Sequence, residues 1–361
     1  MRSGRLIAVI LLAASVLPAV DPGFARAPST PPASAPTVAA AGSQVSVAVD
    51  HHLHVHSPAI LAFLPGYCSS PGRIGKCPEA FTRAYGMAEL IAQMDNAGIR
   101  RGLIMSTAYL AESPMMVPEN PDHANILHAA NAWTVAEARK YPGRFGVYIG
   151  VNPMTDTALS EIAYWGADPN VTGVKIHLTN SGVDLRDPAQ AHKLAKVLRA
   201  AARSHLAITI HMRTRAPDYG ARDVESFVRV VLPAAGNTPV QIAHAAGWGG
   251  TDPQTLSALA AFAKALETQP LLAEHLTFDL AEVWGADTSD VNLVAMATVM
   301  RRIGLSHFVP ASDYPFSGDL ARYYGALYPR LPLTPAEWAV IQSNQPAYAQ
   351  ADYYKQRLLV R

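Results

Sequence analysis

The amino-acid sequence predicts a single (β/α)8 barrel, and three observations support this fold class. From about residue 45 onward, short apolar runs alternate with longer segments of helical periodicity, which favours a parallel sheet covered by helices. Eight such pairs can be found, which is the number that closes a barrel. Six of the eight runs end in polar side chains, and active sites of such barrels lie at that end.

Each predicted strand is rich in β-branched or apolar residues. Strands are expected at 45–50, 101–107, 144–153, 171–178, 206–212, 239–245, 275–280 and 307–313. Helices are expected at 87–98, 123–141, 157–166, 188–204, 224–235, 253–267, 291–304 and 335–350. An open, doubly wound sheet is the alternative architecture, but the sequence lacks the glycine fingerprint that binds phosphate in such sheets.

The N-terminus has the layout of a signal peptide over residues 1–27. Arg2 and Arg5 precede an apolar run, and the small-residue pattern of a cleavage site follows it. An uncleaved anchor is the alternative, although the apolar run is short for a membrane span. We therefore expect export to the periplasm or the medium, with no stable membrane insertion after cleavage.

Residues 28–44 are rich in Pro, Ala, Ser and Thr and carry no charge, so a disordered leader is expected there and the barrel at 45–361. The formal net charge of the 361-residue chain is +1, and its basic residues are scattered. This balance argues against a nucleic-acid or anionic-membrane partner and leaves a small-molecule substrate as the expected partner.

The chain has two cysteines, Cys68 and Cys77, in the Pro/Gly-rich segment YCSSPGRIGKC. An exported protein meets oxidising conditions, so a disulfide is predicted. A two-thiolate metal site is the alternative, but further ligands of the right kind are not nearby in the sequence.

The histidine-rich stretch DHHLH (50–54) ends the first predicted strand. Strand side chains alternate between faces, so His52 and His54 should point the same way, and His51 should point into the helix layer. His56 is expected in the loop beyond. The same alternation puts Lys175 and His177 on the barrel axis.

Four of the strand-end residues are predicted to converge on a divalent metal ion: His52, His54, His211 and Asp313. Imidazole nitrogens and a carboxylate suit zinc, and a catalytic site keeps one position open for water. A metal lowers the pKa of bound water and so produces a hydroxide nucleophile. The alternative is a set of buried histidines satisfied by hydrogen bonds alone.

Taken in order, these motifs resemble the amidohydrolase superfamily and, within it, the amidohydrolase-related (amidohydrolase 2) family of metal-dependent hydrolases and decarboxylases. The resemblance covers nearly the whole predicted barrel and is carried by DHHLH, AELIAQMDNAGIRRGLI, YPGRFGVYIGVNP, GVKIH, DLRDP, ITIHM, IAHAAG and ASDYPF. Each motif alone is weak, whereas the ordered set is specific.

The resemblance implies His52, His54, His211 and Asp313 as metal ligands. It implies His244 as the residue that polarises the substrate or carries a proton, and Asp313 is also placed to act as a base. A superfamily lysine at the position of Lys175 can be carboxylated and bridge two metals, so Lys175 is an additional candidate ligand. One ion is favoured here over two.

The remaining candidates are substrate contacts and supporting residues. His177 is expected to contact substrate or to hydrogen-bond behind the ligands. Arg213 could clamp a carboxylate or face solvent. Trp248 could form an apolar wall or cover the barrel rim, and Asp279 could orient a ligand histidine.

The function predicted from these residues is that of an exported metal-dependent hydrolase, in which a metal-bound hydroxide attacks a small lactone, ester or amide. The first alternative is a metal-dependent, non-oxidative decarboxylase of an aromatic or unsaturated carboxylic acid. The second is a non-catalytic periplasmic binding barrel. The resemblance also makes a homodimer plausible.

Overall fold

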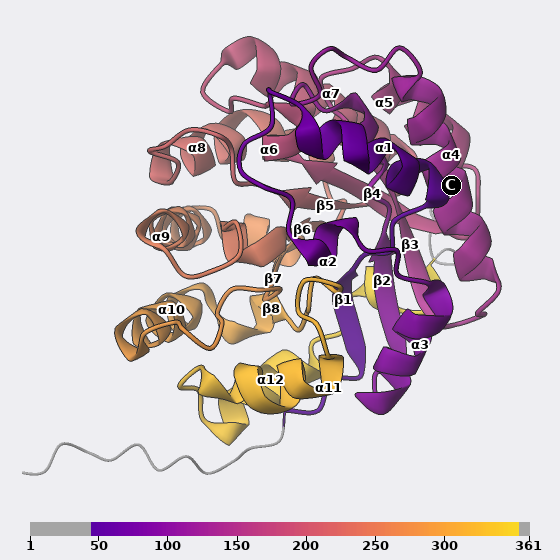
Figure 1. Cartoon of the computed structure of the whole chain (residues 1–361). Coiled ribbons are helices and arrows are strands. Elements are labelled where there is room, and N and C mark those ends of the chain that lie inside the picture. Colours follow the sequence, from indigo (N-terminus) through magenta and orange to yellow (C-terminus); the bar gives the residue numbers. More distant parts are fainter. Residues whose placement is uncertain (1–44, 354–361) are drawn as a thin grey trace, which may run out of the picture. The chain divides into compact units, whose positions relative to one another are not determined.

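The computed structural model describes residues 45–353 and confirms the predicted (β/α)8 barrel. Eight parallel strands follow one another in sequence order, with the helices outside them (Figure 1). The strands are β1 Val49–Leu53, β2 Arg101–Met105, β3 Phe145–Val151, β4 Val171–His177, β5 Ala207–His211, β6 Val240–Ile242, β7 Leu276–Asp279 and β8 Phe308–Val309.

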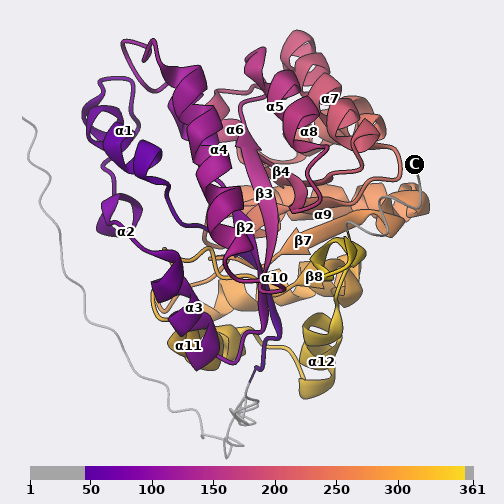
Figure 2. The same ribbon diagram turned by 90° about the vertical axis from the view of Figure 1, so that its right-hand side faces the viewer.

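The main outer helices agree with the sequence-based expectation, and the turned view in Figure 2 shows them packed side by side around the strands. They are α3 Met87–Asn96, α4 His123–Arg139, α5 Thr157–Trp165, α7 Pro188–Arg203, α9 Pro253–Thr268, α10 Asp290–Ile303 and α12 Pro335–Ser343. Between β5 and β6, the helical segment is broken into α8 Ala221–Ser226, a π-helical turn at Phe227–Val231 and a 3-10 turn at Leu232–Ala235. Short helices α2 Glu79–Thr82, α6 Leu178–Ser181 and α11 Leu320–Arg322 lie in the loops.

The predicted signal peptide, the leader and the last part of the predicted barrel, 354–361, lie outside the described residues. Within residues 45–353, the structure has no helix that is both long and apolar enough to cross a membrane.

The barrel closes between β1 and the segment that follows β8. The amide of His51 donates to the Pro310 carbonyl at 3.0 Å, and the amide of Asp313 donates to the His52 carbonyl at 2.8 Å. An isolated parallel bridge joins Leu53 to Tyr314. Since these bonds connect the first strand to the end of the last, they bring His52 and Asp313 together.

The first strand differs from the prediction in two ways. It begins at Val49 rather than residue 45, and its register against β2 shifts between Asp50 and Leu53. Because of this bulge, the prediction that His51 points into the helix layer is wrong. Its ring lies edge-on to Tyr348, whose hydroxyl bonds Thr277 on the inner face of β7.

The longest helix that was not predicted is α1 Pro58–Ser69, which follows β1. Ser57 caps it by accepting a bond from the Ile60 amide, and Pro58 occupies its first turn. Its buried side chains Ile60, Phe63, Leu64 and Tyr67 recur at helical spacing, although Pro65 interrupts the segment. This helix leads directly into the cysteine-containing loop.

The strands alternate as expected between the helix layer and the barrel interior. Val174 and Ile176 belong to the apolar core under the helices, whereas Lys175 and His177, which alternate with them along β4, are buried on the inner side. Near the opposite end of the interior, Tyr148 is fully buried and fills space that Gly173 leaves on β4.

We expect Gly173→Ala to destabilise the fold by about 3 kcal/mol, because the interior is close-packed. A Cβ at Gly173 would lie 2.3 Å from Tyr148 Cε1 and 2.4 Å from the Ala207 carbonyl oxygen. Gly86→Ala is the matched control, since its Cβ would meet no atom within 4 Å. Urea denaturation measures the difference, and equal midpoints for the two variants would contradict the packing argument.

Candidate active site

A cavity of about 430 Å³ opens at the carboxyl ends of the strands. It is lined by histidines at its floor and by aromatic and charged side chains from the loops: His52, His54, His56, Arg73, Ile74, Lys76, Pro78, Phe81, Thr107, Tyr109, Lys175, His177, Asn180, His211, His244, Trp248, Gly249, Glu282, Asp313 and Phe316. Most of the predicted site residues therefore line one cavity.

Three of the histidines are oriented by hydrogen bonds at Nδ1. His52 Nδ1 lies 3.0 Å from Asp279 Oδ2, His54 Nδ1 lies 2.7 Å from the Met105 carbonyl, and His244 Nδ1 lies 2.8 Å from the Ala281 carbonyl. Since each partner is an acceptor, each Nδ1 carries the proton in these bonds. The Nε2 atoms of the neutral rings are then left with lone pairs.

At the cavity floor, these lone pairs meet. His52 Nε2 lies 3.0 Å from His54 Nε2, and Asp313 Oδ1 lies 3.4 and 3.3 Å from the same two nitrogens. Lys175 Nζ lies 2.8 Å from His52 Nε2. Three acceptor atoms so close together repel one another unless a cation lies among them, so this donor set fits a divalent metal ion.

His211 is positioned differently from the other predicted ligands. Its ring stacks on His177 at 3.9 Å between centroids and lies 4.9 Å from the His244 ring. Its buried Nδ1 has no hydrogen-bond partner among the described residues, and it therefore retains a free ligand position. The potential ligand atoms that lie within 4.8 Å of one another come from His52, His54 and Asp313, and from His52, His244 and Asp279.

The charge states favour metal binding. Burial lowers the pKa of His52, His177 and His211 well below the usual range, and the charge of Lys175 adds to this effect, so these imidazoles are neutral. Burial opposes ionisation of Asp313, but the polar imidazole groups of His52, His244 and His54 that surround it, His54 through a hydrogen bond, outweigh burial and lower its pKa to about 2, so it is a carboxylate. Burial lowers the pKa of Lys175 to about 8.

Several site residues have a left-handed backbone conformation, which residues other than glycine rarely adopt. The φ angles are 53° at His244, 61° at Asp313 and 52° at Glu282. Strained residues of this kind persist where the surrounding contacts hold them, and they cluster at functional sites. Asp279 provides such a contact, since its Oδ1 accepts the His244 amide at 2.8 Å.

Asp279 is the predicted orienting residue, and its contact with His52 is present. Its fully buried carboxylate also accepts Gln241 Nε2 at 2.7 Å and the Ala281 amide at 3.2 Å. One side chain therefore connects β1, β6 and β7 behind the floor of the cavity.

The predicted substrate contacts are placed unequally. His177 and Trp248 line the cavity, with Trp248 half exposed at the rim and its ring 5.2 Å from that of His211. Arg213 is not brought to the cavity wall, because its guanidinium pairs with Asp252 at 3.0 Å and lies over the Tyr219 ring.

Several cavity residues were not predicted from the sequence. Glu282, after β7, has a carboxylate whose pKa is raised to about 7 by burial and by the charge of Asp313. Arg73 and Lys76 come from the cysteine-containing loop, and Phe81, Tyr109 and Phe316 add aromatic surface. These residues belong to loops or to short helical turns, where neither spacing nor periodicity distinguishes them.

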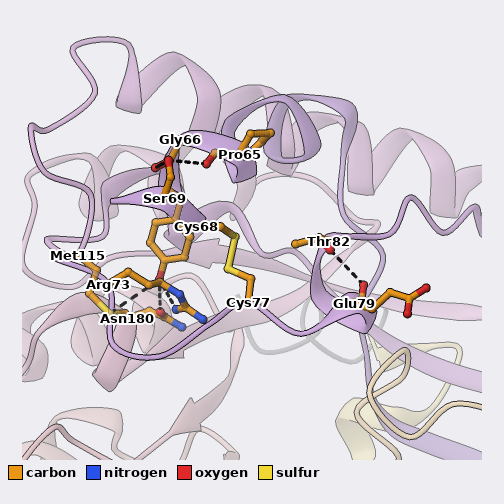
Figure 3. The surroundings of a disulfide bond; sticks show 11 residues. Pro65, Gly66, Cys68, Ser69, Arg73, Cys77, Glu79, Thr82, Met115 and Asn180 are labelled. Atoms are coloured by element: carbon orange, nitrogen blue, oxygen red, sulfur yellow. Dashed lines mark hydrogen bonds between the residues drawn. A yellow bond between two sulfur atoms is a disulfide. The ribbon is translucent and has the colours of Figure 1, made fainter. Parts of the chain in front are cut away.

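The predicted disulfide is present between Cys68 and Cys77 (Figure 3). It closes the loop between α1 and α2, and the same loop carries Arg73 and Lys76 to the cavity wall. Ser70 fixes the loop from the inside, since its Oγ donates to the Met115 carbonyl at 2.7 Å and accepts the Val117 amide at 2.8 Å.

The fold and this floor of imidazoles and a carboxylate define a barrel of the metal-dependent enzyme class. The chain belongs to the amidohydrolase family, since the sequence model described as Amidohydrolase matches residues 49–339. A comparison with curated proteins finds no match.

Solved structures with the same fold share little sequence with this chain. The 5-carboxyvanillate decarboxylase of Sphingomonas paucimobilis is 16% identical with a TM-score of 0.57, over 82% of this chain and 97% of that one. The corresponding enzyme of Novosphingobium aromaticivorans, in complex with manganese, is 14% identical with a TM-score of 0.58, over 87% and 97%. A zinc-bound amidohydrolase of Burkholderia multivorans is 15% identical with a TM-score of 0.54, over 84% and 99%.

We expect Asp279→Asn to weaken metal binding by about 10- to 100-fold, because the amide no longer holds the His52 tautomer as a carboxylate does. Competition with a chromophoric chelator for Zn²⁺ or Mn²⁺ measures the affinity. Asp287→Asn, at an exposed carboxylate in the loop that follows β7, is the control and should bind as the unaltered chain does. Equal affinities for both variants would contradict the orienting role of Asp279.

Proposed function

We propose that the protein is a metal-dependent, non-oxidative decarboxylase of an aromatic or otherwise unsaturated carboxylic acid. One observation carries the proposal, which is the composition of the cavity. Its floor presents the ligand set of His52, His54 and Asp313, and its walls are aromatic rings with two cationic side chains beside them. Such a cavity suits a planar, anionic molecule.

Aromatic rings line the cavity in two groups. Phe81 stacks on Phe316 with centroids 6.2 Å apart, and His56 lies edge-on to Phe81 at 5.1 Å. On the other side, Tyr109 lies 5.3 Å from the His177 ring. A flat, unsaturated substrate can stack on these faces while its carboxylate points to the floor.

The comparisons support the decarboxylase over the hydrolase that the sequence alone favoured. Two of the three similar structures described above are decarboxylases of an aromatic acid, and one was obtained with manganese and a substituted benzoic acid. The third is an amidohydrolase with bound zinc. At this low identity the likeness establishes the fold, so the choice between reactions rests on the cavity and on experiment.

In this proposal, some side chains hold the metal ion and another delivers a proton. His52, His54, His211 and Asp313 would hold the divalent ion, which would act as a Lewis acid and withdraw negative charge from the substrate. The bond from the substrate carbon to its carboxylate breaks, carbon dioxide leaves, and the electron pair remains on the carbon. His244 lines the cavity and would deliver the proton that this carbon takes up as the imidazolium: Nδ1 keeps the proton that it donates to the Ala281 carbonyl, and a second proton, taken from solvent onto Nε2 before the bond breaks, is the one transferred.

A hydrolase of a lactone, ester or amide is the second candidate, and one observation favours it. Lys175 Nζ lies 2.8 Å from His52 Nε2, and the ring of His211 at the end of β5 lies 4.9 Å from that of His244, which follows β6. By resemblance, these residues are the additional ligands of a two-metal hydrolase, in which Asp313 would take a proton from the attacking water.

Product analysis with the metal-loaded chain distinguishes the two reactions. We expect carbon dioxide from a panel of hydroxylated benzoic and unsaturated acids, one solvent deuterium on the product carbon in D2O, and no ¹⁸O from labelled water in the product. Incorporation of ¹⁸O into products of a lactone, ester and amide panel, without carbon dioxide, would replace the decarboxylase by the hydrolase. Tight binding without turnover of either panel would favour the non-catalytic barrel.

Metal removal is a separate test. Exhaustive chelation should lower turnover at least about 100-fold, and Zn²⁺ or Mn²⁺ should restore it, because the floor residues act through the ion. Metal analysis also counts the ions, for which we propose one per chain. Full turnover by a chain that contains no metal would exclude the metal-dependent mechanism.

We expect His244→Gln to lower kcat by about 10²- to 10⁴-fold while the metal content stays the same, because it removes the proton carrier but not the ligands. His192→Gln is the control, since His192 is an exposed residue on α7 that bonds the Pro188 carbonyl. Loss of metal in His244→Gln would make His244 a ligand instead.

We also propose export, on the basis of the N-terminal pattern and the Cys68–Cys77 disulfide. Fractionation of producing cells, with N-terminal sequencing of the mature chain, tests it. A chain that keeps its first 27 residues and stays in the cytosol would contradict it.

A further inference from the structure

The loop closed by the disulfide presents a cation that no side chain neutralises. Among residues 45–353, the Arg73 guanidinium has no carboxylate partner, and its one hydrogen bond runs from Nη1 to the Tyr67 hydroxyl at 3.1 Å. Its Nε is buried without any partner. The Arg73 side chain nevertheless lines the cavity, so a group that neutralises its charge would have to come from a ligand that the cavity receives.

The guanidinium is held in place rather than free to move into solvent. Its carbon Cζ lies 4.9 Å from the centre of the Tyr67 ring and 5.6 Å from that of Phe81. Stacking on two rings fixes the plane of the group. With Nη1 bound to Tyr67 and Nε buried, Nη2 is the donor that remains for an oxygen of an anionic ligand.

A chain of contacts connects this cation to the metal-site histidines. The Tyr67 hydroxyl donates to Asn180 Oδ1 at 2.8 Å, and the backbone amide of Asn180 donates to His177 Nδ1 at 3.4 Å. The His177 ring then stacks on His211. Arg73 is therefore placed relative to the floor of the cavity by side chains that are themselves buried or bonded.

The disulfide completes the arrangement. Cys68 follows Tyr67 directly, and its bond to Cys77 closes the loop that carries Arg73 and Lys76, so the two cations share one short, tethered segment. Lys76 also lines the cavity and has no carboxylate partner among the described residues. Two unneutralised cations on one tethered segment attract negative charge.

We propose that this loop is the substrate-recognition arm of the site and that Arg73 binds a second anionic group of the substrate, apart from the carboxylate that reacts. The substrate class is then an unsaturated dicarboxylate or an equivalent dianion. This inference rests on the proposed function only in placing the reacting carboxylate at the cavity floor. The disulfide acts as a positioning device for Arg73.

Calorimetric binding of benzoate and isophthalate to the metal-loaded full chain tests the inference without requiring turnover. We expect isophthalate to bind at least about 10-fold more tightly than benzoate, because only isophthalate can reach both the floor and Arg73. In Arg73→Gln, isophthalate should bind as weakly as benzoate, and benzoate binding should be unchanged within about twofold. Arg73→Lys should retain part of the preference, since it keeps the charge but not the planar guanidinium that stacks on the two rings.

Arg83→Gln is the matched control, because Arg83 pairs with Glu89 and does not line the cavity. Its preference for isophthalate should equal that of the unaltered chain. The double variant Cys68→Ser, Cys77→Ser should keep its metal content but lose most of the preference. Melting curves and metal analysis identify any variant that fails to fold, and Arg73→Lys then carries the test.

Equal binding of the two acids to the unaltered chain, or equal weakening of both in Arg73→Gln, would overturn the inference. A double serine variant that folds and keeps the full preference would overturn the role of the disulfide. Failure of the proposed function gives a different result. A preference for isophthalate without carbon dioxide release from any acid would support the anion site and exclude the decarboxylase. Carbon dioxide release without a preference for isophthalate would exclude only the anion site.

Discussion

The buried carboxylate of Asp279 is the constraint on which the rest of the site depends. It accepts hydrogen bonds from His52 on β1, from Gln241 on β6, and from the amides of His244 and Ala281. The bond to His52 orients its imidazole toward the cavity. The bond from the His244 amide holds that residue in a left-handed backbone conformation that it would otherwise avoid. A single charge without solvent contact thus determines both where a cation can bind and where a proton carrier stands.

The floor and the walls of the cavity come from different parts of the fold. The floor is built on strand ends and is rigid, because each strand is paired with its neighbours. The walls come from loops, and the most constrained loop is the one closed by Cys68 and Cys77. Chemistry therefore sits on the regular part of the fold, and selection among substrates falls to the irregular part, as is usual for barrels of this kind.

Residues on the strands could be predicted from the sequence, whereas most residues on the loops could not. Strand alternation was enough to put Lys175 and His177 inside and to pair His52 with His54, because period-two patterns depend only on local geometry. It failed at His51, since a bulge in β1 depends on pairing with β2 and β8 that no local pattern reveals. The helix α1 was hidden by Pro65, although its apolar spacing was readable. Arg73 and Glu282 could not be found, because loop residues carry no periodicity.

The hydrogen bonds that close the barrel have a further consequence for its thermodynamics. The cavity's main ligand residues lie on both sides of the seam between β1 and the segment after β8, with Asp313 bonded through its amide to the His52 carbonyl. A cation held by His52, His54 and Asp313 would be bound from both sides of that seam and would therefore link them. Metal binding and resistance to local opening are then linked, and the free energy of ion binding adds to the free energy that keeps the seam shut.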